Sequence, residues 1–188
     1  MNFKPFRDYS EHDVLNLFKL VDATGAKATP VVIANSGWNN NNGTPRVALD
    51  LAAGLGNPNI YSPRWEIYPA LRRAVSGEKP LGLTLYDTRE VNYLGYPLIY
   101  DQQRAKELQT VTSGQAVPVV RKGIFIVGPF QTGESPAPGK YAAVRGTGEI
   151  GVAAATTGVS GVALPVFGEF LGTKDTDGYA LVSINCYL

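Results

Sequence analysis

The chain has 188 residues, which is enough to bury a core without disulfides or metal ions and suits one domain, or one domain with an extension. Charged residues make up only 18%, and the net charge of +1 gives no electrostatic reason to expect nucleic acid as a partner. A single cysteine, Cys186, excludes an intrachain disulfide and a cysteine-rich zinc site, and no apolar run is long enough to span a membrane. Residues 1–6 lack the apolar core of a signal peptide, so we expect the protein to be made and kept in a cytoplasm, or built into something assembled there.

The first 28 residues are predicted to form an extended N-terminal arm that carries one short helix. Ser10 is a suitable helix N-cap, with Asp13 three residues on as in a capping box, and Val14 and Phe18 then share one helix face. The arm holds more apolar surface than so short a helix hides, so it either packs on another protein or folds back on its own core. Its candidate contacts with a capsid or a neighbouring subunit are its apolar side chains Phe3, Phe6, Tyr9, Leu17 and Phe18.

Residues 29–188 are predicted to form a mainly β domain, a compact barrel or sandwich. Glycine (21 residues) and proline (13 residues) are abundant and favour many turns over long helices. Short runs rich in β-branched and aromatic residues, bounded by such turns, predict strands at 29–34, 81–86, 98–100, 117–120, 124–127, 140–144, 149–152, 166–171 and 179–188. Helical turns are expected over 69–77 and 101–108, while 46–55 fits a strand or a helix equally well.

The stretch from Ser113 to Val127 is expected to be the centre of the β structure. Its two apolar runs lie on either side of residues 121–123, and such residues fit a pleated, packed surface better than a helix. Pro118 has no N–H to donate to a strand ladder. The strand that contains it is therefore expected at a sheet edge or with a bulge at that point.

The last predicted strand shows the clearest alternation of apolar and polar residues. One face carries Ala180, Val182, Ile184, Cys186 and Leu188. The segment 173–178 before it has the composition of a hairpin turn. Asp175 and Asp177 in that segment suggest a calcium loop, but the twelfth position counted from Asp175 is Cys186 and not a glutamate, so a hairpin turn is expected instead.

Three glycines match a nucleotide-binding motif without its usual context. Gly146, Gly148 and Gly151 have the spacing of the dinucleotide-binding fingerprint, which requires a preceding strand, a long following helix and repeated βαβ units. Further glycines follow too soon for that helix, and Glu149 would lie beside the pyrophosphate. The motif therefore predicts a tight turn between two strands.

The residues that could support catalysis do not form a recognisable set. His12, the only histidine, lies near the start of the chain, and Cys186 alternates onto an apolar face where a thiol is inert. Asp87, Glu90 and Asp101 could pair as in a glycosidase, but they fall in polar connections where solvated charge is expected. We therefore expect no enzyme activity, no catalytic residue, no metal and no cofactor.

Aromatic side chains are the remaining candidates for binding. The chain has ten tyrosines, and Trp38 and Trp65 lie in loop-like stretches. Exposed aromatics of this kind suit protein contacts or glycan stacking better than covalent chemistry. The alternative is that they line the core.

Three stretches together resemble structural proteins of tailed bacteriophages. Residues 8–18 resemble the opening of phage head fibre proteins. Residues 82–118 look like a pattern found in virion proteins of marine and related phages. The closing glycine-rich β region is similar in style to capsid cement, or decoration, proteins, over 139–144 and 167–172.

The resemblance implies binding to a capsid lattice, commonly as a trimer seated among major capsid subunits, and it implies neither catalytic residues nor a cofactor. Head fibres usually continue into a long fibrous repeat, which this chain lacks, so a compact decoration protein is favoured. We expect a homotrimer on the capsid surface of the virion, made in the host cytoplasm, that binds the major capsid protein and neither nucleic acid nor membrane. The alternatives are another virion module, such as a tail, fibre-base or receptor- or glycan-binding protein, and a carbohydrate-active enzyme.

Overall fold

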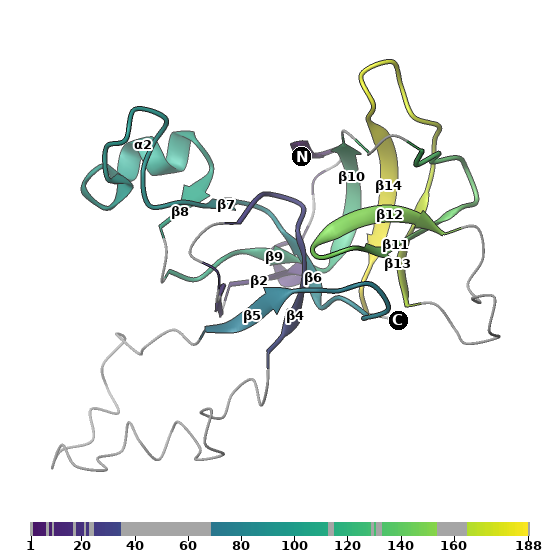
Figure 1. Cartoon of the computed structure of the whole chain (residues 1–188), viewed down its shortest axis with the longest axis horizontal. Coiled ribbons are helices and arrows are strands. Elements are labelled where there is room, and N and C mark those ends of the chain that lie inside the picture. Colours follow the sequence, from purple (N-terminus) through teal and green to yellow (C-terminus); the bar gives the residue numbers. More distant parts are fainter. Residues whose placement is uncertain are drawn as a thin grey trace, which may run out of the picture.

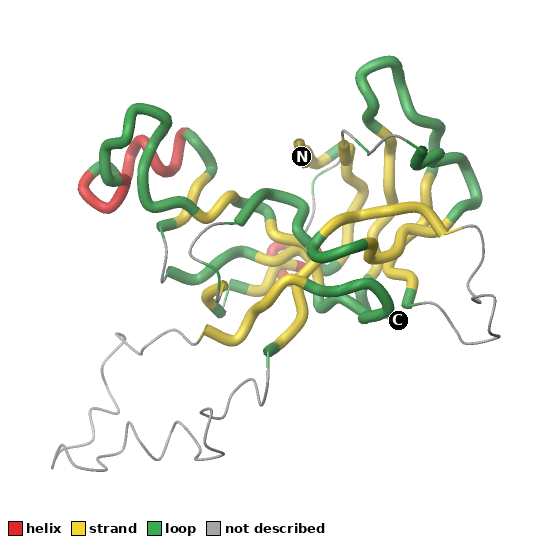
Figure 2. Tube along the Cα trace, in the orientation of Figure 1, coloured by secondary structure: helices red, strands yellow, loops and turns green. Residues whose placement is uncertain are grey.

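The protein is mainly β, as predicted. The computed structural model describes residues 2–6, 8, 10–16, 18–20, 22, 25–34, 69–112, 115–128, 130, 133–153 and 165–187. Within these residues the strands form two six-stranded sheets, and neither sheet closes into a barrel. Figure 1 shows the two sheets beside one another, and Figure 2 shows a short helix at one end of the molecule, apart from them.

The first sheet is antiparallel throughout. Its strands, in spatial order, are β1 (Asn2–Pro5), β10 (Lys122–Gly128), β14 (Ala180–Asn185), β13 (Val166–Phe170), β11 (Tyr141–Arg145) and β12 (Glu149–Ala153). The alternation predicted for the last strand is confirmed, because Ala180, Val182, Ile184 and Cys186 are buried while the residues between them are half-buried. Leu188 lies outside the described residues.

The second sheet combines short strands from the first half of the chain with one from its centre. Its strands, in spatial order, are β2 (Val14–Leu15), β9 (Val119–Val120), β6 (Gly82–Thr84), β4 (Pro30–Ile33), β5 (Pro69–Arg73) and β3 (Lys19–Leu20). Its pairs are antiparallel except for β3 with β5, which is parallel.

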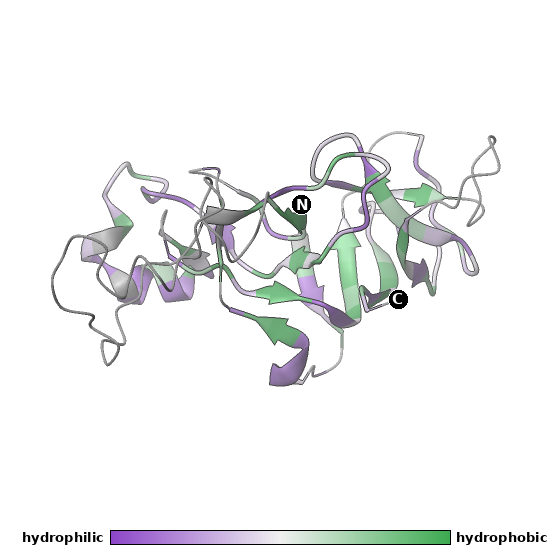
Figure 3. Ribbon diagram, turned by 90° about the horizontal axis from the view of Figure 1, so that it is seen from below, coloured by the Kyte–Doolittle hydropathy of each residue, from purple (hydrophilic) through white to green (hydrophobic). Residues whose placement is uncertain are grey.

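One buried cluster receives side chains from both sheets. It includes Phe125 and Val182 from the first sheet and Leu83 and Val120 from the second. Removing such side chains from water stabilises the fold by about 25 cal/mol for each Å² of apolar surface buried. Figure 3 shows hydrophobic residues concentrated on the strands and hydrophilic ones on the helix. The cluster therefore joins the two sheets into one body.

The second sheet is also covered on its other face. Val120 belongs to the shared cluster, whereas its neighbour Val119 belongs to a smaller cluster with Leu71. Val32 and Val31 divide between the two clusters in the same way. Successive side chains of a strand point to opposite faces, so a strand buried on both faces has a continuous apolar run rather than an alternating one.

Residues 117–128 connect the two sheets, which confirms their central place. β9 lies between β2 and β6, and β10 lies between β1 and β14. The prediction that Pro118 marks an edge strand or a bulge is wrong. β9 is an inner strand that begins at Val119, so no ladder N–H is needed at Pro118, whose carbonyl accepts a hydrogen bond from the Leu85 N–H (2.9 Å).

The first residues of the chain belong to the sheets. β1 pairs with β10, and β2 and β3 lie at the two edges of the second sheet. Phe3 is only 5% exposed and stacks on Phe125 with ring centroids 4.4 Å apart. Of the two alternatives for this segment, folding back on its own core therefore holds for Phe3. The predicted boundary at residue 28 does not separate a free arm from the sheets.

The predicted N-terminal helix is wrong beyond its first turn. Ser10 does act as a cap, because its hydroxyl accepts a hydrogen bond from the His12 N–H (3.3 Å). The 3₁₀ turn η1 (Glu11–Asp13) then ends at Val14, which pairs with Val120 in the second sheet. Pairing with another strand and packing against the core replace the helix that the local pattern favours.

Two other predicted elements are of the wrong type. The helical turn expected over 69–77 is the strand β5, which pairs with β4, and the strand expected over 98–100 is the 3₁₀ turn η2 (Leu98–Tyr100). The helix predicted after Asp101 is confirmed as α2 (Gln102–Glu107). The Asp101 Oδ1 accepts from the Arg104 N–H (3.0 Å), as expected of an N-cap.

Candidate binding surface

Residues 86–112, called the lobe below, lie apart from the two sheets (Figure 1). The lobe contains the parallel pair β7 (Asp87–Thr88) and β8 (Thr110–Val111) together with η2 and α2, and α2 packs on both η2 and β8. Leu98 and Ala105 are buried within it, and neither belongs to the clusters of the sheets. The lobe therefore has a small core of its own.

The segment 25–29 connects the lobe to the body, and Val111 of the lobe packs against the smaller cluster of the second sheet. The Lys27 N–H donates to the Asp87 Oδ1 (2.7 Å), and the Lys27 Nζ donates to the Gln109 Oε1 (2.8 Å). Gly25 and Thr88 form an antiparallel bridge with two backbone hydrogen bonds, of 3.0 and 2.7 Å. The segment therefore binds β7 and Gln109, the residue just before β8, at the base of the lobe.

The surface of the lobe is unusually apolar for its size. Five large apolar side chains within ten consecutive residues are exposed: Val91 (46%), Tyr93 (67%), Leu94 (64%), Tyr96 (66%) and Tyr100 (88%). Single exposed hydrophobic residues are normal on any protein, but a concentration of this kind marks an interaction surface. The lobe is therefore the candidate functional site.

The loop that carries three of these side chains is tightly organised around Asn92. Its side-chain Oδ1 accepts hydrogen bonds from the N–H groups of Leu94 (2.8 Å) and Tyr96 (3.0 Å). Its backbone N–H donates to the Tyr96 carbonyl (2.9 Å), and its carbonyl accepts from the Gly95 N–H (3.0 Å). Gly95 has a φ of +83°, a value that side-chain-bearing residues rarely adopt. The loop thus holds one conformation with its apolar side chains outward.

Tyr93 is fixed from the helix as well. An Arg104 guanidinium nitrogen donates to the Tyr93 hydroxyl (2.6 Å), and the guanidinium carbon lies 5.5 Å from the centre of the ring. Another guanidinium nitrogen of Arg104 lies 3.8 Å from a carboxylate oxygen of Glu107, three residues on in α2. The helix therefore orients an aromatic ring that would otherwise move freely in solvent.

No family model, curated protein or solved structure matches this chain. The role of the lobe is therefore inferred from its own contacts, exposure and charge.

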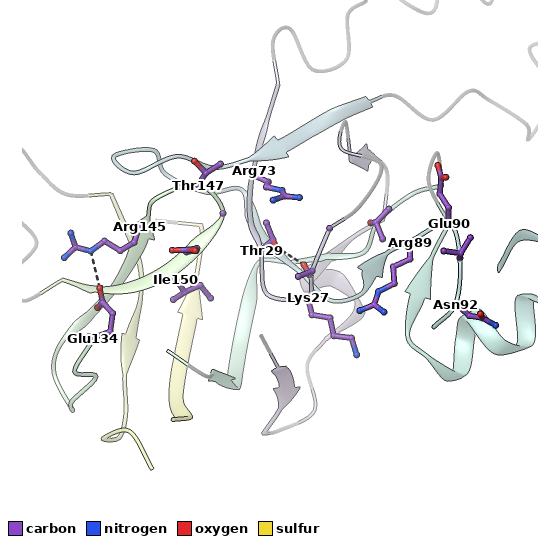
Figure 4. A pocket seen from close by; sticks show the side chains of 16 residues that line it. Lys27, Thr29, Arg73, Arg89, Glu90, Asn92, Glu134, Arg145, Thr147 and Ile150 are labelled. Carbon is purple, nitrogen blue, oxygen red and sulfur yellow. Dashed lines mark hydrogen bonds and ion pairs between the residues drawn. The ribbon is translucent and has the colours of Figure 1, made fainter. Parts of the chain in front are cut away.

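A cavity of about 880 Å³ lies between the lobe and the sheets (Figure 4). Its walls come from the β11–β12 turn and from residues 88–92, and the segment 25–29 lies between them. The charged residues of its lining are Lys27, Arg73, Arg89, Arg145, Glu90, Glu134 and Glu149. With four cations and three carboxylates, the lining offers no field of a single sign to attract an anion or a cation.

Several of the cations have partners at the wall. The Arg73 Nε lies 3.0 Å from the Asp22 Oδ2, and an Arg89 nitrogen lies 3.2 Å from the Asp87 Oδ2. Glu134 accepts from the backbone N–H of Val152 (2.8 Å) on the outer edge of β12. The described lining contains neither histidine nor cysteine.

Of the five apolar residues predicted as outside contacts, the three that the structure describes differ in burial. Phe3 is in the core, Phe6 is 58% exposed, and Phe18 is half-buried against the smaller cluster. Tyr9 and Leu17 lie outside the described residues, as do Trp38, Trp65 and residues 46–55. Of the three members of this set that the structure describes, Phe6 is the exposed one.

Both motifs predicted to be turns are turns. Gly146 and Gly148, with φ of +52° and +74°, lie in the β11–β12 hairpin, so the glycine spacing serves a tight turn. In the β13–β14 hairpin the Asp175 Oδ1 accepts from the N–H groups of Asp177 (3.0 Å) and Tyr179 (2.7 Å). These bonds use one oxygen of the Asp175 carboxylate to hold the hairpin turn.

The predicted catalytic candidates are dispersed among structural roles. His12 is exposed in η1, while Cys186 is buried, and burial raises the pKa of its thiol to about 12. Asp87 anchors the base of the lobe, Asp101 caps α2, and Glu90 is exposed at the rim of the cavity. Among the described residues no group of three or more histidine, cysteine, aspartate or glutamate side chains could hold a metal ion.

No helix within the described ranges has the length and apolarity needed to cross a bilayer.

The exposed loop of the lobe was not among the sites predicted from the sequence. Its signal in the sequence is the spacing of two turn-forming residues, Asn92 and Gly95, with tyrosines beside each of them.

Proposed function

We propose that this protein is a non-catalytic binding protein of a virus particle, a decoration protein that binds the assembled head of a bacteriophage and stabilises it. The observation that carries the proposal is the concentration of exposed Tyr93, Leu94, Tyr96 and Tyr100 on the lobe. Together with Val91 these side chains expose about 600 Å², given that a tyrosine side chain buries ~150–250 Å² when covered. The largest contiguous apolar patch on a typical monomeric protein is about 300–600 Å².

The physical reason for such a role is linkage between binding and assembly. An assembled shell presents seams between subunits that do not exist in the free subunits. A protein that binds only across a seam lowers the free energy of the assembled state and not that of its parts. The near-zero net charge of +1 fits a partner that is held by apolar contact and not by charge.

The same proposal covers the architecture, the partner, the oligomeric state and the location of the protein. The two sheets with a shared cluster are proposed to form a sandwich, with the major capsid protein as partner, a homotrimer as the bound form and the capsid surface as location. The resemblance of residues 8–18 and 82–118 to phage virion proteins supports this assignment. Neither nucleic acid nor a membrane is proposed as a partner.

The proposal is tested on particles. Purified heads of the phage that encodes the chain are stripped of the protein, mixed with the recombinant protein and sedimented. We expect saturable binding at a fixed ratio to the major capsid protein, and heads that resist heating or low salt better once bound. Saturation at a handful of copies per particle, or binding only to tails, would refute the head assignment.

A receptor- or glycan-binding role is the second candidate, because exposed tyrosines also stack on sugar rings. This role predicts retention on a glycan array and few copies per particle. A carbohydrate-active enzyme would in addition release product from the bound glycan. An array without signal would remove both.

A further inference from the structure

We propose that Glu134 and Arg145 form a removable cap on the outer edge of β12, and that this cap prevents β12 from pairing with the β12 of a second copy of this chain. The cap adds to the proposed function without depending on it, because it acts in the free protein. β12 is the last strand of the first sheet in spatial order, so one of its sides has no strand neighbour among the described residues. An exposed edge of this kind offers backbone N–H and C=O groups to any other extended chain.

Both backbone groups of Val152, in the middle of this edge, are occupied by side chains. The Val152 N–H donates to the Glu134 Oε2 (2.8 Å), and the Val152 carbonyl accepts from an Arg145 guanidinium nitrogen (3.0 Å). The Arg145 Nε lies 3.9 Å from the Glu134 Oε1, so opposite charges lie beside each other in the cap. A neighbouring strand would offer one acceptor and one donor to the same two backbone groups. The two side chains therefore take the place of a strand at this residue.

The segment that carries Glu134 is connected to the first sheet by two lysines. The Glu134 carbonyl accepts from the Lys174 Nζ (3.2 Å), and the carbonyl of the next residue, Ser135, accepts from the Lys140 Nζ (3.0 Å). Lys174 lies in the β13–β14 hairpin, and Lys140 comes immediately before β11. These contacts favour the position of the Glu134 carboxylate beside β12.

Gly151 leaves the space through which Arg145 reaches the edge. Arg145 is paired with Glu149, so its side chain extends along the hairpin past Gly151 to reach Val152. A Cβ at position 151 would overlap the Arg145 side chain. The φ of Gly151 is not positive, so glycine is needed here for space and not for backbone conformation. The lack of a side chain at position 151 is therefore part of the cap.

The edge behind the cap is complementary to itself. In an antiparallel ladder every second residue points its backbone groups outward, so Ile150 faces the same way as Val152. If two copies of β12 pair about a two-fold axis at Gly151, Ile150 of each copy lies opposite Val152 of the other and exchanges both backbone hydrogen bonds with it. Glu149 then lies opposite Ala153, so no like charges meet. Ile150 and Val152 both belong to the shared cluster, so the pairing also places apolar side chains beside each other across the axis. A second copy of the chain thus supplies the complementary edge.

The test is the association of the free, full-length protein, measured by sedimentation equilibrium from about 5 to 500 μM. Glu134→Ala/Arg145→Ala removes the cap without changing the net charge, and we expect its mass to rise with concentration above that of the parent protein, toward twice that mass. The matched control is Lys106→Ala/Glu107→Ala, which removes one exposed cation and one exposed carboxylate from α2. It also removes the Arg104–Glu107 ion pair, of similar length, and should leave the mass unchanged.

Two further measurements show whether the cap acts through its hydrogen bonds and where the copies meet. Glu134→Gln/Arg145→Lys keeps an acceptor and a donor at the edge, so its mass should equal that of the parent protein. Pairing of two edges protects the Ile150 N–H, so in the double alanine variant its hydrogen exchange should slow by about 3- to 10-fold from the lowest to the highest concentration. In the parent protein the same rate should not depend on concentration.

A mass equal to that of the parent protein, with Ile150 exchange independent of concentration, would overturn the proposal. A mass that rises without protection of Ile150 would also overturn it, because the association would then use another surface. Equal association of the Gln/Lys variant would show that the cap does not act through hydrogen bonds. If the double alanine variant does not fold, Glu134→Ala decides instead, because Glu134 lies outside the strands and its loss frees only the Val152 N–H. If Ile150 in that variant is not protected as the concentration rises, the proposal is wrong.

Discussion

Replacing Phe3 by alanine should destabilise the whole protein, although Phe3 lies at the beginning of the chain. The ring is 5% exposed and stacks on Phe125 at 4.4 Å in the shared cluster. Burial of a phenylalanine side chain is worth about 2 kcal/mol. A stacked aromatic pair adds about 1 kcal/mol. We therefore expect Phe3→Ala to lower the free energy of unfolding by about 3 kcal/mol, within the ~3–5 kcal/mol range measured for such changes in cores.

The matched control is Phe6→Ala, at a side chain that is 58% exposed just after β1. It should cost less than about 0.5 kcal/mol, as other surface substitutions do. Urea unfolding followed by fluorescence gives both values, and in thermal melts the Phe3 variant should lose about 6–12 °C, at ~2–4 °C for each kcal/mol in a domain of this size. Equal midpoints for the two variants would show that β1 is not held in the sheet and that the first residues are a free arm.

Three further predictions concern other parts of the fold. Ile184→Asp places an unpaired charge on the buried face of β14 and should prevent folding. Asn185→Asp, at the next residue, which is half-buried, should be tolerated. If circular dichroism does not distinguish the two variants, the register of β14 is wrong. The Glu78 carboxylate accepts two hydrogen bonds from Arg72 (2.8 and 2.5 Å) and one from the Val75 N–H (2.9 Å), which lower its pKa to about 2. Because the pKa is depressed in the folded protein, the stabilisation by ionised Glu78 is present above pH 4.5 and is lost as the pH falls toward 2. The difference in the free energy of unfolding between the parent protein and Glu78→Gln, measured in urea titrations, should therefore narrow over that range. A constant difference would contradict this prediction. The Cys186 thiol, buried and with its pKa raised to about 12, should not react with Ellman's reagent at pH 8 until urea unfolds the protein, and rapid reaction of the native protein would show that this face is open.

Much of the first sheet could be predicted from local sequence. β11, β12, β13 and β14 are short apolar runs between glycine-rich turns, and the alternation in β14 identifies its buried face without knowledge of its neighbours. The hairpins are local, because Asp175 and Gly148 determine their turns within a few residues. These elements were predicted because everything that determines them lies within the same ten to fifteen residues.

The elements that were missed depend on contacts with distant residues. Leu71 and Ala74 have the spacing of one helix face, but pairing with β4 makes this segment a strand. The burial of Phe3 depends on Phe125, more than a hundred residues away. No local pattern could have placed either of them correctly.

The sequence indicated the type of the candidate site, a surface for protein contacts, but not its position in the fold. The abundance of tyrosine suggested protein contacts, but whether a tyrosine lines the core or faces water is decided by the fold around it. In the lobe Leu98 and Ala105 are buried whereas Tyr93 and Tyr96 are exposed, and this division is visible only in three dimensions.

The position of β10 has a consequence for how the chain folds as it is synthesised. β10 is paired on one side with residues 2–5, which are synthesised before it, and on the other with residues 180–185, which are synthesised after it. Because β9 and β10 are nearly continuous, the second sheet and β1 can assemble around residues 117–128 while the other side of β10 still lacks its neighbour. The first sheet can be completed only after translation has passed residue 185, since pairings between such distant segments are slow to form. During that interval β10 has an unpaired edge of Ile124, Phe125, Ile126 and Val127, a template for misassembly between nascent chains. The yield of native protein should therefore depend on how quickly the last strand is delivered.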